Sequence, residues 1–451
     1  MKKIAVFLSV LMIISIIAPI KASAITFTPS FKVESEAAYL INLDKDVVVY
    51  EKNSIKKMYP ASLTKIMTAI IVLDHVKDLD NTYYEAPLAV FDDLYGKGAS
   101  AVGYSRGEVA SATDLMYSML IYSACESAGI LAYHVGGESI PNFVDMMNQK
   151  AQELGCTGTH FTNPHGLYDD DQYTNARDMA VITKYALDNY PKFKEFALTT
   201  EYVMKATNYQ AEGWATIYHT NKMLFPANDY YYQYAKGIKT GTLDESGRNL
   251  ITMASKDGNN YLLVTMGAPM YDKDGNAIYP HYTDHKNIYE WAFNTFEYKS
   301  IISTDEEITE IPVKFGKEQD YVILVPDKEY SALWPNTLDM STLKIDIDTS
   351  GFLDKNGKIT APVQKGQKLG TYTLSLSGEK LCSVDLVARD NISLNETAYN
   401  IEKAKAFIGS FWFKLAAAIA ISLVIFYIII YLITAKKRRR KIKRVRKKRK
   451  F

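Results

Sequence analysis

Near the C-terminus, twenty consecutive residues without a charge, Leu415 to Thr434, constrain this chain more than any other feature. At a helical rise of about 1.5 Å per residue, such a run is long enough to cross the hydrocarbon layer of a bilayer. The next fifteen residues, 436–450, contain 13 Lys or Arg residues. A basic run directly after a membrane span is typical of a cytoplasmic flank. We therefore expect a transmembrane helix at 415–434, a basic cytoplasmic tail at 435–451 and a body on the exported side.

The first 24 residues have the arrangement of a secretory signal. Lys2 and Lys3 precede a long apolar run, and small residues stand at Ala22 and Ala24. This order of charge, apolar run and A-x-A site predicts a signal peptide at 1–24 that is removed on export. The same run retained as an N-terminal anchor is the alternative. Both versions place the body of the protein outside the cytoplasm.

The charge of the body excludes one large class of partners. Of the 52 Lys and Arg residues, 13 lie in the C-terminal tail and 3 in the signal, which leaves 36 against 51 Asp and Glu and a net charge of −15. An acidic body repels polyanions, so we expect no nucleic acid among its partners.

Cysteine and histidine usage gives no sign of a metal site or of a disulfide framework. Three cysteines are sparse and odd in number, which allows one disulfide at most. Neither C-x-x-C nor H-E-x-x-H occurs in the sequence, so no spacing supports a metal site, and we expect no cofactor.

Between signal and span, 390 residues remain, which is too many for one ordinary core, so two domains are expected. From 301 to 395, short stretches of strand-forming residues alternate with Gly, Asp and Asn, which predicts an all-β domain. Residues 396–414 end in aromatic residues beside the span and are interpreted as a juxtamembrane stalk. Residues 25–300 form the first domain.

The first domain mixes strand and helix patterns. Two strands joined at L-D-K-D (43–46) and three more between Gly237 and Met266 predict a five-stranded antiparallel sheet. Between these blocks, apolar residues recur at three- and four-residue spacing, which predicts a helical subdomain. Helices are expected within 61–76, 111–135, 140–155 and 176–187. The predicted fold class is α/β, of the α+β kind, followed by the β domain and a membrane helix.

A serine and a lysine open the first of these helices. Ser62 stands three residues before Lys65. This spacing puts hydroxyl and amine on one helical face, where a neutral lysine can take the proton of the hydroxyl. Ser62 also lies in the first turn, whose free backbone N–H groups can help to stabilise an oxyanion. Because S-x-x-K also occurs by chance in many helices, the motif alone is weak evidence.

A second motif, K-T-G, follows some 170 residues later, with Lys239, Thr240 and Gly241 on a predicted strand. Gly241 lets a substrate backbone approach the strand, and Lys239 adds positive charge beside the nucleophile. S-x-x-K on a helix followed by K-T-G on a strand is a much stronger signal than either motif, because order and structural context match one type of active site.

With these motifs the chain resembles the D-alanyl-D-alanine carboxypeptidases, which are low-molecular-mass penicillin-binding proteins and serine peptidases related to β-lactamases. The resemblance covers most of residues 36–300. It rests on four blocks in order: the entry hairpin with the S-x-x-K helix, N-P-H-G-L, H-T-N-K-M-L and the K-T-G strand. It implies a β-lactamase-like catalytic fold that removes the terminal D-alanine from peptidoglycan stem peptides, with β-lactams as covalent inhibitors. A β domain and a C-terminal membrane anchor also fit this family.

The family carries Ser-x-Asn as a third motif, in a loop between two helices. Ser123 matches its serine, and Cys125 occupies the asparagine position. A thiol is a weaker donor and acceptor than an amide, so the resemblance puts substrate positioning by Cys125 in question. A nucleophilic role for Cys125 is disfavoured, because the neighbouring Glu126 opposes formation of a thiolate.

The resemblance also implies a mechanism. Ser62 attacks the carbonyl between the two D-alanines, with Lys65 as the base. The backbone amides of Ser62 and Thr242 stabilise the oxyanion. Ser123 and Lys239 pass the proton to the leaving amine, and water then hydrolyses the acyl-enzyme.

Thr240 and Thr242 are expected to hold the terminal carboxylate of the substrate. The family often adds an arginine in a later R-F-x-D segment, where this chain has H-Y-T-D, so His281 is expected to give a weaker or pH-dependent positive charge. Arg248 is interpreted as a solvated or sheet-pairing residue. His165, in N-P-H-G-L, is interpreted as part of a turn rather than as a base.

Three alternatives remain open. A β-lactamase would need fast deacylation, and no E-x-x-L-N segment follows the second motif to supply the glutamate. A D,D-endopeptidase would differ only in the room beyond the scissile bond. In a catalytically weakened wall-binding protein, Cys125 would mark the decay of the site.

Overall fold

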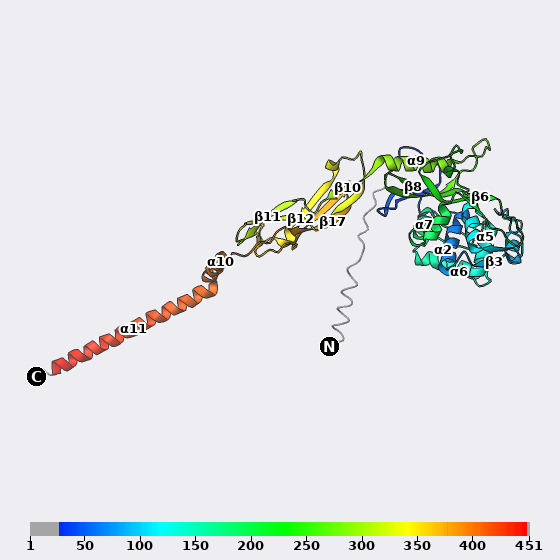
Figure 1. Cartoon of the computed structure of the whole chain (residues 1–451). Coiled ribbons are helices and arrows are strands. Elements are labelled where there is room, and N and C mark those ends of the chain that lie inside the picture. Colours follow the sequence, from blue (N-terminus) through cyan, green and yellow to red (C-terminus); the bar gives the residue numbers. More distant parts are fainter. Residues whose placement is uncertain (1–26, 377, 449–451) are drawn as a thin grey trace. The chain divides into compact units, whose positions relative to one another are not determined.

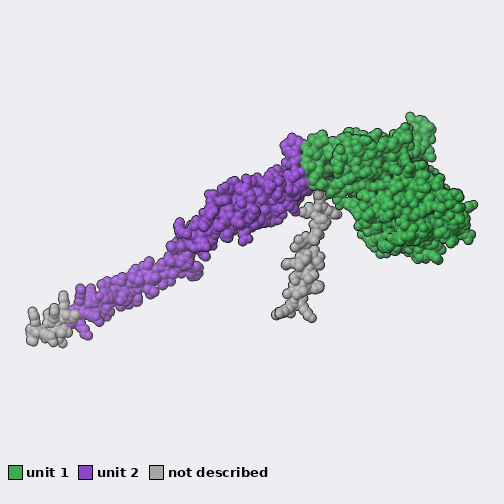
Figure 2. All heavy atoms as spheres, viewed as in Figure 1, with its two compact units in different colours: residues 1–299, 333–338 green, residues 300–332, 339–451 purple. Residues whose placement is uncertain are grey.

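The computed structural model describes residues 27–376 and 378–448, so the expected signal at 1–24 lies outside the described part. The chain divides into two compact units (Figure 2). One unit runs up to Lys299 and also includes Leu333–Leu338, and the other contains Ser300–Ala332 and everything from Asp339 onward. The domain boundary expected from the sequence lies at residue 300.

A five-stranded sheet with the order β2-β1-β9-β8-β7 forms the centre of the first unit. Its strands are β1 (Ala37–Asn42), β2 (Val47–Lys52), β7 (Ala235–Leu243), β8 (Gly247–Lys256) and β9 (Asn259–Ala268). All neighbours pair antiparallel, which confirms the predicted sheet. The order leaves β7, which carries K-T-G, as an edge strand.

Helices cover both faces of this sheet (Figure 1). On one face, α9 (Pro280–Thr295) packs against β8 and β9. On the other face, α7 contacts β1 and β9, and the remaining helices build an apolar core around α2 and α5. These helices are α2 (Lys65–His75), α3 (Leu88–Leu94), α4 (Ala112–Tyr117), α5 (Cys125–Val135), α6 (Ile140–Glu153), α7 (Ala176–Asn189) and α8 (Pro191–Leu198). Four short strands complete the unit: β3 (Tyr83–Glu85), β4 (Val109–Ser111), β5 (Glu201–Val203) and β6 (Thr216–Tyr218).

Residues 111–135, where apolar spacing predicted helix, are interrupted. After α4 comes one π-helical turn, η3 (Ser118–Tyr122), and Ser123 then adopts a left-handed conformation with φ 75°. The amide of Ala124 donates to the carbonyl of Ser118 (3.0 Å), and α5 starts at Cys125. The break turns Ser123 out of both helices into a loop.

The second unit contains a six-stranded sheet with the order β14-β16-β17-β12-β11-β15, which confirms the predicted β domain. Its strands are β11 (Thr309–Lys314), β12 (Tyr321–Pro326), β14 (Lys344–Asp348), β15 (Ile359–Thr360), β16 (Lys368–Leu376) and β17 (Glu379–Ala388). Two further strands, β10 (Phe296–Ile302) and β13 (Tyr330–Pro335), each run from one unit into the other along the chain.

Two helices follow the β domain. The expected stalk begins with α10 (Glu396–Gly409), and α11 (Phe411–Lys448) contains the expected span and part of the basic tail. From Phe411 to Lys441, this helix is long and apolar enough to cross a membrane, with a mean hydropathy of 2.8 over its most apolar stretch.

Candidate active site

Ser62 lies in a short 3-10 turn, η2 (Ala61–Thr64), that leads directly into α2 at Lys65. The turn packs against the edge strand β7. Asn249 of β8 donates from Nδ2 to the carbonyl oxygens of Tyr59 (3.0 Å) and Pro60 (3.1 Å). These two bonds fix the backbone immediately before the turn.

Backbone segments approach one another closely around Ala61, which has a left-handed φ of 49°. A Cβ added to Gly166 would lie 1.9 Å from the Ala61 carbonyl oxygen. One added to Gly241 would lie 3.2 Å from both the Ala61 Cβ and the Ser62 nitrogen. The two glycines therefore allow three segments of the chain to meet at the serine.

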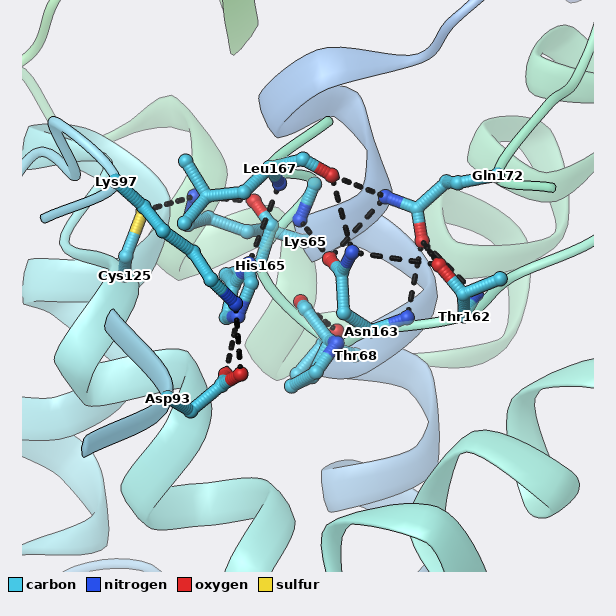
Figure 3. Close-up of polar contacts among 12 residues, drawn as sticks. Lys65, Thr68, Asp93, Lys97, Cys125, Thr162, Asn163, His165, Leu167 and Gln172 are labelled. Carbon is cyan, nitrogen blue, oxygen red and sulfur yellow. Dashed lines mark hydrogen bonds and ion pairs between the residues drawn. The ribbon is translucent and has the colours of Figure 1, made fainter. Parts of the chain in front are cut away.

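The amine of Lys65 is fully buried and has three neighbours at hydrogen-bonding distance, of which His165 and Cys125 are labelled in Figure 3. Its Nζ lies 2.9 Å from Ser62 Oγ, 2.6 Å from the carbonyl oxygen of His165 and 3.4 Å from Cys125 Sγ. The S-x-x-K pair is thus in direct contact, and the sulfur at the asparagine position touches the lysine.

The N-P-H-G-L loop supplies that carbonyl from a rigid turn. Asn163 Oδ1 accepts a hydrogen bond from the Gly166 amide (2.7 Å), and its Nδ2 donates to the Leu167 carbonyl (3.0 Å). The Pro164 carbonyl accepts from Thr68 Oγ1 of α2 (2.6 Å). The loop is tied both to itself and to the helix that carries Lys65.

His165 acts within this loop through its ring as well. Its Nδ1 accepts from the Leu167 amide (3.2 Å), so Nε2 carries the proton and donates to Asp93 Oδ2 of α3 (2.9 Å). This hydrogen bond, together with Lys97, lowers the pKa of Asp93 to about 2, and burial lowers the pKa of His165. Figure 3 shows the His165 ring bonded to Asp93, while only the backbone carbonyl of His165 reaches Lys65.

The S-x-C segment brings Cys125 into contact with the lysine, and both Ser123 and Cys125 are buried. Cys125 is 2% exposed and Ser123 6% exposed. Glu126 turns the other way, because its Oε1 accepts from the amides of Val102 (2.7 Å) and Gly103 (3.0 Å). Burial raises the pKa of this carboxyl group. Glu126 therefore fastens the neighbouring loop rather than entering the site.

The K-T-G strand brings a second buried lysine to the site. Lys239 is fully buried, and its Nζ donates to the Thr240 carbonyl (3.1 Å). Burial and the charge of Lys65 hold the pKa of Lys239 well below its usual range. Thr240 Oγ1 lies 2.6 Å from Thr220 Oγ1, so the H-T-N-K segment is bonded to the strand.

His281 does not supply the positive charge expected of it. The residue is 3% exposed, and burial together with the charges of Arg248 and Lys222 lowers its pKa to about 3. Burial thus disfavours a positive charge on this ring, against the expectation of a pH-dependent cation at this position. Arg248 does pair in the sheet, opposite Thr242 of β7.

A cavity of about 470 Å³ opens at the end of the K-T-G strand. Thr242 and Leu243 line it on one side, and Leu167, Tyr168 and Lys97 on the other. The space lies beside the strand and the N-P-H-G-L loop, where a peptide bound along β7 would continue.

Neither Thr220 nor Asn249 was singled out as a site residue from the sequence. Thr220 lies in the quoted H-T-N-K-M-L block, which was the available signal, whereas nothing in the sequence links Asn249 to residues 59–60. No group of His, Cys, Asp and Glu side chains suited to a metal ion occurs within residues 27–376 and 378–448. The three cysteines are free.

Two sequence profiles match the chain. The profile described as D-alanyl-D-alanine carboxypeptidase matches residues 23–270, and the one described as the C-terminal domain of penicillin-binding protein 5 matches residues 296–393. Among curated relatives, D-alanyl-D-alanine carboxypeptidase DacF of Bacillus subtilis is 28% identical, over 80% of this chain and 86% of that protein. DacC of Escherichia coli is 27% identical, over 80% of this chain and 84% of that protein.

Solved structures agree. Penicillin-binding protein 5 from Haemophilus influenzae superposes with a TM-score of 0.56 at 25% identity and covers 81% of this chain and 99% of its own. The Streptomyces K15 DD-transpeptidase superposes with a TM-score of 0.53 at 25% identity, over 59% of this chain and 99% of its own. Because the first profile spans more than half of the sequence, the chain belongs to the D-alanyl-D-alanine carboxypeptidase family of serine peptidases.

Proposed function

We propose that this D-Ala-D-Ala carboxypeptidase removes the terminal D-alanine from peptidoglycan stem peptides through an acyl-enzyme on Ser62. The contact between Ser62 Oγ and Lys65 Nζ, at 2.9 Å, carries the proposal. β-Lactams would acylate the same oxygen, as the family implies.

The surroundings of Lys65 suit a base. A neutral amine has two N–H donors and one lone pair. The His165 carbonyl can only accept, and Cys125 Sγ is available as a second, weaker acceptor. In the structure Lys65 Nζ donates to Ser62 Oγ (2.9 Å). Once the amine has lost a proton, its lone pair can take the hydroxyl proton along the same contact as Oγ bonds to the substrate carbonyl carbon.

The remaining groups complete the cycle. The amides of Ser62 and Thr242 are proposed to receive the negative charge that develops on the carbonyl oxygen. When the C–N bond breaks, Ser123 and Lys239 pass to the leaving amine the proton that Lys65 took from Ser62, so Lys65 is again free to accept a proton from the attacking water. Water then attacks the ester and regenerates Ser62. The free edge of β7 offers the substrate backbone a strand to pair with.

Transpeptidation is a second candidate activity, and Cys125 favours it. Solved variants of the Streptomyces K15 DD-transpeptidase replace a serine and, two positions further on, a cysteine. Ser123 and Cys125 have the same spacing. In that reaction an amine, in place of water, would take the acyl group from Ser62.

The C-terminal helix supports a membrane-anchored, exported enzyme. The length and hydropathy of α11 suit a span, and the basic residues that follow suit the cytoplasmic side. The catalytic unit would then face the peptidoglycan.

One assay tests the core of the proposal. Full-length protein in detergent is incubated with a pentapeptide ending in D-Ala-D-Ala, and free D-alanine and labelling by a fluorescent penicillin are measured. Ser62→Ala should abolish both without shifting the thermal midpoint, because only the acyl bond needs that oxygen. Ser105→Ala, at an exposed serine, is the matched control. Labelling that persists in Ser62→Ala would place the nucleophile elsewhere, and a wild-type protein without D-alanine release would overturn the function.

A further inference from the structure

The substrate of a carboxypeptidase ends in a carboxylate, and His281 gives that group no charge to bind. The His281 ring is buried, and its Nδ1 has no hydrogen-bond partner among the described residues. It lies close enough to Arg248 and Lys222 for their charges to lower its pKa. Arg248 and Lys222 also both contact the Tyr279 ring, which lies beside His281, so two basic side chains lie near the position where the expected cation is missing.

Arg248 is placed on the same face of the sheet as the threonines of the K-T-G strand. It lies directly opposite Thr242 in the β7–β8 pair, and opposed residues of an antiparallel pair share a face. Thr240, two residues before Thr242, shares that face as well. Lys239 and Gly241 point to the opposite face.

The guanidinium of Arg248 is held in place. Its Nε donates to the Ile278 carbonyl (2.8 Å), and its Cζ lies 4.1 Å from the centroid of the Tyr279 ring. Only one of its five N–H donors is used in that bond. The two terminal NH₂ groups remain for the two oxygens of a carboxylate, in the bidentate geometry that arginine favours.

Lys222 brings a second cation from a different element. It begins the 3-10 turn η4 (Lys222–Leu224), and its Nζ lies 4.1 Å from the same Tyr279 centroid. Thr220, two residues earlier, is the residue bonded to Thr240. The H-T-N-K segment, the start of β8 and the chain leading into α9 thus meet at the face that carries Thr240.

The two cations have no acidic partner in an ion pair within residues 27–376 and 378–448. Among the described residues, neither Arg248 nor Lys222 forms an ion pair with an Asp or Glu. Asp284 is the acid of α9 nearest in sequence to His281. Its carboxylate already accepts hydrogen bonds from the Glu34 amide (3.0 Å) and from the amide (2.7 Å) and hydroxyl (2.6 Å) of Ser35. An anion is what this pair of charges lacks.

We propose that Arg248, assisted by Lys222, binds the terminal carboxylate of the substrate next to Thr240 and Thr242, and so makes the enzyme specific for a free C-terminus. The cation expected from the first turn of α9 is supplied in this chain by β8 and by the H-T-N-K segment. This inference rests on the proposed function, since it needs a peptide bound along β7.

The test compares two substrates that differ only in the group proposed to contact Arg248. One is a tripeptide ending in D-Ala-D-Ala, and the other is the same tripeptide with a C-terminal amide. Full-length wild type and variants in detergent are assayed for the shortened peptide, and kcat and KM are determined for each substrate. Wild type should prefer the free acid.

Arg248→Gln should lower kcat/KM for the free acid roughly 10- to 100-fold, the range for losing hydrogen bonds to a charged group, and leave the amide unchanged. Lys222→Met should act in the same direction but less, and Arg248→Lys should keep part of the preference. Lys256→Met is the matched control, because Lys256 lies at the other end of β8, 5.3 Å from the Tyr234 ring centroid, and its loss should change neither substrate.

Each outcome supports or overturns the proposed carboxylate site. Equal losses for both substrates in Arg248→Gln would make the arginine a structural residue, and an unchanged preference for the free acid would remove it from the carboxylate site. If Arg248→Gln does not fold, as judged by its thermal midpoint, the substrate preference of Arg248→Lys and Lys222→Met answers the same question. A wild type without activity on either peptide would overturn the proposed function itself, which separates that failure from this one.

Discussion

Cys125 stands where the family resemblance implies an asparagine, and its sulfur lies 3.4 Å from the amine of Lys65. A sulfur accepts hydrogen bonds weakly, so the cysteine directs the lysine without holding it firmly. The site therefore keeps its geometry while losing an amide that could reach the substrate carbonyl.

Cys125→Asn should leave the carboxypeptidase activity unchanged or raise it several-fold, because one restored hydrogen bond is worth about 1 kcal/mol. Cys125→Ala should stay near the parent rate, since a thiol contributes little when removed. The rate of D-alanine release is measured for both variants.

Cys156→Ala is the control for this pair of variants, because burial raises the pKa of that distant thiol to about 12 and keeps it unreactive. A folded Cys125→Ala protein without any activity would make the cysteine catalytic and contradict its interpretation as a substituted asparagine.

Contacts between residues close in the sequence could be predicted from spacing, whereas contacts between distant residues could not. Ser62 and Lys65 meet because they are three residues apart on one helical turn, so spacing alone predicted the contact. The bonds from Asn249 to residues 59 and 60 span nearly 190 positions and leave no local pattern. The contact of Arg248 with the Tyr279 ring likewise joins distant parts of the chain and leaves no local pattern.

Helix α9 was not predicted from the spacing of apolar residues, and its buried face shows why. Its buried face includes His281, Asp284 and His285, so polar residues stand where an apolar stripe would mark a helix. In α6 and α7 the buried positions are mostly apolar, and both helices were predicted within a few residues of their ends.

The N-P-H-G-L loop contributes a backbone carbonyl oxygen, that of His165, to the site, and a substitution can test whether Lys65 depends on it. Asn163→Ala removes the bonds to Gly166 and Leu167 and should lower the free energy of unfolding by about 1–3 kcal/mol. Because the His165 carbonyl then orients Lys65 less firmly, kcat should fall more than KM changes. Urea unfolding and steady-state kinetics measure the two effects.

Asn276→Ala, at an exposed turn, is the comparison variant for the loop. If Asn163→Ala loses stability but keeps the wild-type kcat, the loop is a structural support only, and Lys65 does not depend on it.

For the molecule as a whole, the division into units predicts that the anchor is separable. Deletion of 415–451 should release an active soluble protein, because α11 makes no contribution to either apolar core of the catalytic unit. D-alanine release by the soluble fraction measures this. A fully inactive truncated protein would show that the C-terminal segment has a structural role in catalysis.

The buried histidines make the catalytic unit sensitive to acid. Burial lowers the pKa of both His219 and His281 from 6.5 to about 3. Between these values the unfolded chain binds protons that the folded chain does not, so stability falls as pH decreases from about 6.5 to about 3. The slope is about 1.4 kcal/mol per pH unit for each histidine.

Urea midpoints of the truncated protein across this pH range test the acid sensitivity. His281→Asn should flatten the decline, while His160→Asn, at a more exposed ring, should not. A midpoint that stays constant from pH 6.5 to 4 would contradict the burial of these rings as neutral groups.

The close packing around Ala61 also limits which substitutions this sequence can accumulate. A side chain at position 166 would meet the Ala61 carbonyl group, and one at position 241 would meet the Ala61 Cβ and the Ser62 nitrogen, so a larger residue at either position requires a change around Ala61. Neutral change there requires coordinated substitutions, which are rare in a lineage that accumulates them singly. Ala61, Gly166 and Gly241 would therefore be retained longer than the catalytic residues. A descendant protein that had lost Ser62 would still have small residues at these three positions.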